Sequence, residues 1–492
     1  MLKTDLKILF LLFAVFLTVS FSLPVQAQTT TEFELDPDEV MSLEQAIDIS
    51  VANNTDIKRA LLSVMDADEQ VRIAWSEVMP NVSTSATYTR NLEIPVNFLP
   101  AEFFGGEAGE LIPVAFGTDN NWTGGVTVSQ NIFRGEAIVG ISSSALYKSA
   151  QQENLRATLQ QVVTETRKAY YRVLVAEEQL RLQQATVQRI RQNLEENQKR
   201  YQAGLVDEYD VLRLEVQLSN QQPLIREAEY NVEQAYRDLK QLLGIPVDMP
   251  FKSAGNLNQF DILSEVAAVP ENESLKKIDR FTSLPPSDDR EVVSTMREQR
   301  GDLRMLDVQD ELKDREILAI KSRFLPTVTA DYNLRWTSAQ AGAPVFFEDA
   351  RRYQTIALTV SLPLFEGFQR RANLSRAFIE KKDIREQQEA TERAAKNEYE
   401  SAKENLNRLF ETAAARQKAL EQARRGYEIA LQRYNEGIGA QIEVNEAELE
   451  VREAELNYAQ MVFDYLSAKA DYDFALGLVP KADQAGSLVN NY

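Results

Sequence analysis

The stretch ALQRYNEGIGAQIEVNEAELEVREAELNYAQMVFDYLSAKADYDFALG, residues Ala430–Gly477, decides the fold because the chain contains it twice in related form. Each copy reads as a long polar helix, a Tyr-x-x-Gly turn and a return helix that ends in Leu-Gly shortly before a proline. Glycine adopts positive φ at low cost, so the turn glycines are natural points of chain reversal. The two copies align without a gap at a spacing of 233 residues, which places Tyr434 on Tyr201, Gly437 on Gly204 and Gly477 on Gly244.

The return helices carry apolar residues at sevenfold spacing, which is the pattern of a left-handed coiled coil. The second copy holds two such series, roughly 160–200° apart around the helix axis. A helix with two apolar seams needs a neighbour on each side, as in a ring of helices. An ordinary antiparallel bundle remains an alternative. The series are Ile442, Leu449, Leu456 and Phe463; Val444, Val451, Tyr458, Tyr465 and Tyr472; and, in the first copy, Val211, Leu218, Ile225, Val232 and Leu239.

The composition of the 492 residues excludes several functions. The chain has no cysteine and no histidine, so it cannot form a disulfide, a His/Cys zinc site or a histidine-based catalytic triad. The net charge of −21 argues against nucleic acid as a partner. We expect no enzyme activity, no catalytic residue, no metal and no cofactor.

The N-terminus has the pattern of a secretory signal peptide. Lys3 and Lys7 precede the apolar run Ile8–Phe21, and Val25-Gln26-Ala27 is a small-residue cleavage site. We expect residues 1–27 to be removed after Ala27. An uncleaved anchor is the alternative, although the apolar run is short for a membrane span.

Four stretches alternate apolar and polar residues and predict strands at about 82–90, 122–132, 328–336 and 354–364. Strands of this length and pattern fit a transmembrane barrel, and soluble half-buried hairpins would read the same. Residues 91–121 are expected to be a long exposed loop, with 340–352 as its shorter counterpart. Four strands leave two open edges that lipid cannot satisfy, so a barrel would have to close with other chains.

The strands and helices belong to a duplicated unit of helix, strand, strand, long helix and return helix. The first repeat covers 28–245, with a long helix from about Glu136 to Ala203 and a return helix that Pro223 should kink. The second repeat covers 289–480. Residues 246–288 are predicted to be an insert or linker, and 481–492 a flexible tail.

This plan resembles the TolC family of outer-membrane channel proteins over nearly all of the mature chain. The resemblance rests on the order and double occurrence of the elements, on the strand end Val360–Gly367 (VSLPLFEG), and on the tips Tyr201–Leu205 (YQAGL) and Tyr434–Ile438 (YNEGI). It implies a mainly α fold with a membrane β-barrel part. As a homotrimer, the chain would form a 12-stranded β-barrel on a long α-helical coiled-coil barrel, with an equatorial region built from the insert and the termini.

The resemblance also implies functional residues at the periplasmic end. Glu443 and Glu446 occupy the positions of two acidic residues that would form rings at the pore constriction, and a solvated helix face is the alternative. Tyr434 and Asp210 match tip-gating residues, whereas Gly439 stands where the family arginine that ties the tip shut is expected. The tips that would contact an adaptor are Gly204, Leu205, Gly437 and Ile438.

The function implied is an exit duct in the outer membrane that extends into the periplasm. It would dock to a periplasmic adaptor and an inner-membrane transporter of the RND, ABC or MFS type, in tripartite efflux or type I secretion. The sequence does not reveal the cargo, the transporter class or the open width. The competing interpretation is a periplasmic structural or adhesive coiled-coil protein without a barrel.

Overall fold

The structure is a computed structural model that describes residues 40–107, 109–255, 257, 289–345, 349–479 and 481. The expected signal peptide, most of the insert and nearly all of the tail lie outside these residues. The described residues of Met41–Asp248 and those from Ser253 onwards form one compact unit, which holds every contact discussed below.

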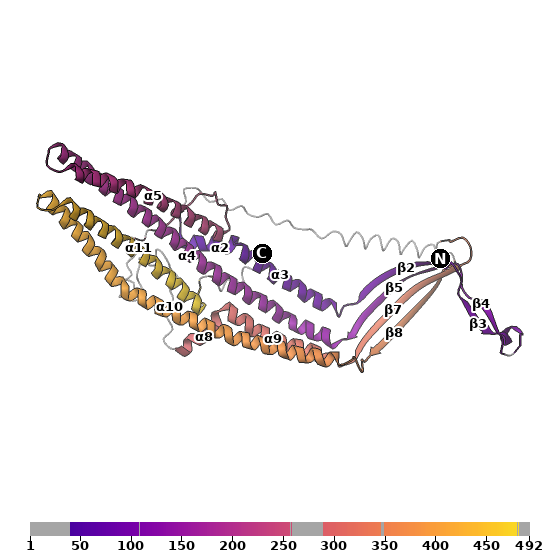
Figure 1. The fold of residues 1–492 in the computed structure, drawn as a ribbon. Helices are drawn as coiled ribbons and strands as arrows, with labels where there is room; N and C mark the ends of the chain where they lie inside the picture. Colours follow the sequence, from indigo (N-terminus) through magenta and orange to yellow (C-terminus); the bar gives the residue numbers. More distant parts are fainter. Residues whose placement is uncertain are drawn as a thin grey trace. The chain divides into compact units, whose positions relative to one another are not determined.

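The described elements follow the duplicated order (Figure 1). The helices are α2 (Leu43–Asn53), α3 (Thr55–Ser76), the 3-10 turn η1 (Ala101–Phe104), α4 (Gly135–Gln202), α5 (Glu208–Leu243), α8 (Asp289–Gln299), α9 (Gly301–Ser322), α10 (Gln369–Asn435) and α11 (Gln441–Leu476). The strands are β1 (Val40–Met41), β2 (Asn81–Arg90), β3 (Val96–Pro100), β4 (Leu111–Ala115), β5 (Asn120–Phe133), β6 (Lys252–Ser253), β7 (Thr327–Gln340) and β8 (Arg351–Ser361).

The four alternating stretches form one antiparallel sheet in the order β2-β5-β7-β8 (Figure 1). The register lines up most of the apolar residues of the four strands on one face, which Arg352 and Gln354 of β8 also join: Ala86 and Tyr88 on β2; Trp122, Val126 and Val128 on β5; Tyr332, Leu334 and Trp336 on β7; Ile356, Leu358 and Val360 on β8. The opposite face carries mainly Ser, Thr, Asn, Asp and Arg. Within the described residues, β2 and β8 each have one strand neighbour, so both edges of the sheet are open.

The long helices form two hairpins, α4 with α5 and α10 with α11, which also contact each other through α4 and α11. The helices α4 and α10 have 68 and 67 residues, which at 1.5 Å per residue makes each about 100 Å long. A fully buried ion pair joins the hairpins, because Arg167 on α4 lies 2.9 Å from the Asp473 carboxylate on α11. Pro223 lies inside α5, which stays helical from Glu208 to Leu243.

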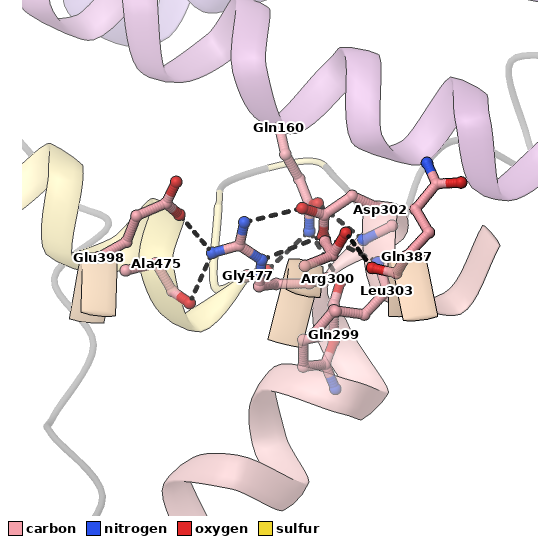
Figure 2. Close-up of polar contacts among 11 residues, drawn as sticks. Gln160, Gln299, Arg300, Asp302, Leu303, Gln387, Glu398, Ala475 and Gly477 are labelled. Atoms are coloured by element: carbon pink, nitrogen blue, oxygen red, sulfur yellow. Dashed lines mark hydrogen bonds and ion pairs between the residues drawn. The ribbon is translucent and has the colours of Figure 1, made fainter. Parts of the chain in front are cut away.

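The break between α8 and α9 is held by polar contacts to distant segments (Figure 2). The Gln160 amide on α4 donates to the carbonyls of Gln299 and Gly477, at 2.8 and 2.9 Å, and accepts from Gly301 N at 3.0 Å. The guanidinium of Arg300 pairs with Asp302 and Glu398 and donates to the Ala475 carbonyl. One junction therefore fixes α4, α9, α10 and the end of α11.

The first repeat has the corresponding junction between α2 and α3. Asn54, which aligns with Arg300, caps α3 by accepting from Asp56 N and donates to the Leu242 carbonyl at 2.9 Å. In each repeat, the glycine that follows the return helix packs closely against the backbone of this junction. A Cβ on Gly244 would come within 2.5 Å of Asn53 O, and one on Gly477 within 2.7 Å of Arg300 N. Both sites thus need glycine for space as well as for their positive φ.

The connection between β2 and β5 corrects one expectation. Residues 91–121 are not simply a loop, because β3 and β4 pair as an antiparallel hairpin around the turn η1. The prediction failed because neither five-residue strand alternates apolar and polar residues along its length, and each contains a proline.

Among the described residues, no helix is both long enough and apolar enough to cross a membrane.

Candidate functional site: the two helical tips

The two tips are built by the same turn. After α4, Gly204 takes a φ of +71° and Leu205 N donates back to the Arg200 carbonyl at 2.9 Å. After α10, Gly437 takes a φ of +75° and Ile438 N donates to the Arg433 carbonyl at 3.0 Å. A Cβ would strain both glycines, so the repeated glycine spacing in the sequence reflects a backbone requirement.

Tyr434 connects the two tips through a hydrogen bond. Its ring is buried at the end of α10, and its hydroxyl donates to the side-chain oxygen of Asn197 on α4. The Asn197 amide in turn donates to Gln441 on α11 at 3.2 Å, and the Gln441 amide donates to Asn445 at 3.0 Å. A chain of buried hydrogen bonds therefore spans α10, α4 and α11. The sequence pointed to Tyr434 but not to its partners.

Arg200 on α4 makes a second connection between the tips. Its guanidinium lies 4.7 Å from the centre of the Tyr434 ring and donates to Asn435 on α10 at 3.1 Å. Burial raises the pKa of the Tyr434 phenol, while the Arg200 charge acts to lower it and the Asp210 charge to raise it. Asp210, on the first turn of α5, thus acts on Tyr434 through its charge.

The two candidate constriction residues differ in their surroundings. Glu443 is half-buried, and its carboxylate lies 3.5 Å from the Arg433 guanidinium at the end of α10. Glu446 is exposed and forms no ion pair among the described residues. Both lie on the first two turns of α11, directly behind the tip.

Gly439 lies too close to its own turn to carry a side chain without adjustment. A Cβ there would come within 3.1 Å of Tyr434 N and of Arg433 Cβ, and Gly439 N donates to the Arg433 carbonyl at 3.1 Å. The cation nearest to Glu443 in this tip is supplied by Arg433, six residues before the position expected from the resemblance.

The four residues predicted to contact an adaptor stand at the ends of the hairpins. Gly204 and Gly437 are exposed, and Leu205 and Ile438 are 75% and 67% exposed. Each tip therefore offers one large aliphatic side chain next to a turn glycine.

A second polar layer lies several turns behind the tips and was not predicted. Arg189 on α4 lies 3.6 Å from Glu448 and 3.8 Å from Glu455, two buried carboxylates of α11. Gln217 on α5 donates to Glu448 at 2.9 Å, and Arg424 on α10 pairs with Glu455 at 2.9 Å. All four long helices thus contribute to this network.

Burial raises the pKa of Glu448 above its ordinary value, and the charges of Arg189 and Arg452 act in the opposite direction. The only sequence signal for the network is the sevenfold spacing of Gln441, Glu448 and Glu455 beside the apolar series. Among the described residues, no group of three or more acidic, histidine or cysteine side chains could hold a metal ion.

Comparisons with known proteins agree with this geometry. The sequence matches the outer membrane efflux protein family over residues 46–245 and 292–478. The fold is similar to the CmeC outer membrane channel of Campylobacter jejuni, at 18% identity and a TM-score of 0.67, with 91% of this chain and 88% of that chain covered. No curated protein matches the sequence significantly.

Two further solved structures have the same fold. The outer membrane protein VceC of Vibrio cholerae matches at 16% identity and a TM-score of 0.66, with 88% of this chain and 96% of that chain covered. The open state of the MtrE outer membrane channel of Neisseria gonorrhoeae matches at 20% identity and a TM-score of 0.67, with 88% of each chain covered.

Proposed function

Because the chain belongs to the outer membrane efflux protein family and is an outer-membrane efflux channel, we propose that three copies enclose its conduit. Four strands from each copy would close a 12-stranded barrel in the outer membrane, and the long helices would continue the conduit into the periplasm. The observation that carries this proposal is the pair of open edges, β2 and β8, on a sheet with one apolar and one polar face.

An apolar sheet face is stable against lipid. The open edges of a single copy are not, because unpaired backbone N–H and C=O groups are costly in lipid. Aromatic side chains on the apolar face support a membrane position. Tyr88 and Trp122 stack with ring centres 4.3 Å apart, near the end of the strands that carries Trp336. Aromatic girdles of this kind mark the membrane–water interface in outer-membrane barrels.

Exposed apolar side chains on the helices also support an assembly of several copies. Leu212, Val216 and Tyr230 on α5 are more than half exposed, although α5 buries another face against α4. On α10, Phe378, Ile379 and Ile429 are also exposed. In a ring of copies, α5 of one subunit would lie beside α10 of the next, which would cover both sets.

We assign gating to the tips. The hydrogen bonds from Tyr434 and Arg200 would hold the hairpins together in a closed state, with Asp210 contributing its charge. Glu443 and Glu446 would form two rings of carboxylates behind the tip, which would constrict the pore and favour cations. Gly439 would keep the turn compact where the family arginine is absent, leaving Arg433 to neutralise Glu443.

The exposed tips would be the docking site of a periplasmic adaptor. Leu205 and Ile438, next to Gly204 and Gly437, fit apolar contacts with the ends of partner helices. The adaptor would connect the channel to an inner-membrane transporter of the RND, ABC or MFS type, which would select the cargo.

Extraction and mass measurement test the assembly. We expect the mature chain to fractionate with the outer membrane, to need detergent for extraction, and to have three times the chain mass in detergent. A monomer that is soluble without detergent would contradict the proposal and favour a periplasmic coiled-coil protein. Photo-cross-linkers at Leu205 and Ile438 should capture the adaptor, whereas one at exposed Glu404 in the middle of α10 should not.

A further inference from the structure

The β3–β4 hairpin has apolar surface that the rest of the described chain does not cover. Its register pairs Val96 with Ala115, Phe98 with Pro113 and Pro100 with Leu111, so one face is entirely apolar. Phe98 and Leu111 are 66% and 59% exposed. A two-stranded hairpin is marginally stable alone in water, so this one needs a surface to pack on.

The segment that carries the hairpin is also strongly acidic. Residues 91–119 contain five carboxylates and no lysine or arginine: Glu93, Glu102, Glu107, Glu110 and Asp119. None of the five forms an ion pair among the described residues. A surface that binds this acidic segment should therefore be positively charged, which argues against an anionic lipid surface as its binding site.

Two arginines at the start of β8 have the complementary charge. Arg351 and Arg352 are exposed, and neither forms an ion pair within the part of the chain that the structure describes. In their own sheet, β5 and β7 separate β8 from β2, which places the two edges about 14 Å apart at ~4.8 Å per strand.

The internal repeat gives the register in which a second copy would join the open edge. The first strand of repeat one aligns with that of repeat two at a spacing of 246 residues, and the second strands align at 232. Within the chain, β7 pairs with β5 through Tyr332 with Val128 and Leu334 with Val126. The same pairing between subunits places Ala86 opposite Val360 and Tyr88 opposite Leu358 of the neighbouring subunit.

In this register β8 is longer than its partner. Arg90, the last residue of β2, would lie opposite Ile356, so residues 351–355 of the neighbour extend past the end of β2. These five residues span roughly 17 Å at 3.4 Å per residue. The chain that runs beside them is the segment from Asn91 to β3, which leads directly into the acidic hairpin.

We propose that the β3–β4 hairpin docks across the subunit boundary onto the outer end of β8 of a neighbouring copy. Carboxylates of residues 91–119 would meet Arg351 and Arg352, and the apolar face of the hairpin would cover the neighbouring strand end. The inference rests on the proposed closure of the sheet by copies of the chain. This contact between the hairpin of one copy and the outer end of β8 of the next, which we call the clasp, would add to the strand pairing between copies.

The absence of cysteine from the chain makes cross-linking a direct test. Three double-cysteine variants are compared in the outer membrane with a short bismaleimide linker. Tyr88→Cys with Leu358→Cys reports the strand boundary, and Glu93→Cys with Arg352→Cys reports the clasp. Glu93→Cys with Ser361→Cys is the control, because Ser361 is at the opposite end of β8.

We expect the boundary pair and the clasp pair to give covalent dimers and trimers on denaturing gels, and the control pair to give monomer. Products from the boundary pair without products from the clasp pair would overturn the inference and leave the proposed channel intact. Failure of both pairs together with a monomeric mass in detergent would refute the channel assembly and the clasp with it.

Charge reversal tests the same contact without cross-linking. Arg351→Glu/Arg352→Glu should lower the temperature at which the detergent-solubilised oligomer dissociates, and Glu93→Lys/Glu110→Lys in the same chain should restore it. Loss of stability without any restoration would contradict the charge pairing.

Discussion

The Tyr434 hydroxyl at the end of α10 donates a hydrogen bond to the side-chain oxygen of Asn197 on α4, and so joins the two helical hairpins at their tips. Both residues are buried. A buried acceptor that loses its donor costs about 1–3 kcal/mol, which corresponds to roughly 5- to 150-fold in an equilibrium constant.

Tyr434→Phe should therefore favour separation of the tips. We expect the fraction of time spent in an open state to rise about tenfold in planar-bilayer recordings. Tyr201→Phe is the matched control, because Tyr201 holds the aligned position on the other tip and is 45% exposed. Equal behaviour of the two variants would mean that the hydrogen bond to Asn197 does not hold the tips together.

Gly477→Ala should destabilise the chain strongly. The residue has a φ of +77°, and a Cβ would lie 2.7 Å from Arg300 N in the junction of Figure 2. The left-handed conformation alone costs roughly 1–2 kcal/mol for a residue with a Cβ, and the overlap with backbone adds to it.

Gly426→Ala provides the comparison, since Gly426 lies inside α10 and, apart from its chain neighbours and the adjacent turns of its own helix backbone, no atom lies within 4 Å of its ideal Cβ. Removing glycine from a helix interior stabilises by about 1 kcal/mol. Thermal unfolding followed by circular dichroism should therefore shift in opposite directions for the two variants. A Gly477→Ala melting temperature equal to that of the unchanged chain would show that the backbone around Arg300 accommodates the added methyl group at little cost in stability.

Glu448→Gln should flatten the dependence of stability on pH. Burial raises the Glu448 pKa in the folded state, so on acidification the folded chain binds a proton before the unfolded chain does. The stability contribution of this group is therefore present at low pH and is lost as pH rises through the folded-state pKa.

The check is the melting temperature measured at several pH values between 7 and 5. The unchanged chain should gain stability from Glu448 on acidification, and Glu448→Gln should lack that gain. Glu446→Gln, at an exposed position two residues earlier, is the control. A larger gain in stability on acidification in Glu448→Gln than in the unchanged chain would show that folding lowers the pKa of Glu448 rather than raising it.

Much of the fold follows from local patterns. The alternation at about 328–336 and 354–364 predicts strands because side chains point to opposite faces with period two, and the structure has these strands at Thr327–Gln340 and Arg351–Ser361. Gly204 and Gly437 mark the tips because the reversal needs positive φ. Duplication doubled each signal, so the order of elements could be predicted from a single sequence.

The partners within the site could not be predicted in the same way. Tyr434 and Asn197 are 237 positions apart, and nothing local to either residue specifies the other. Arg300 aligns with Asn54, yet it reaches Glu398 on α10 whereas the shorter Asn54 ends at the Leu242 carbonyl. Such contacts depend on side-chain length and on packing between distant helices.

The central claim is that copies of this chain enclose a pore whose narrowest part carries Glu443 and Glu446. Single-channel conductance and reversal potential of the purified mature protein, beside Glu443→Ala/Glu446→Ala, test it most directly. Glu227→Ala/Glu229→Ala on α5, with the same charge change at exposed positions away from the tip, is the control. We predict a small, cation-preferring conductance that loses its cation preference and rises only in the tip variant. A conductance and selectivity identical in all three proteins would contradict the placement of the two glutamates at the constriction.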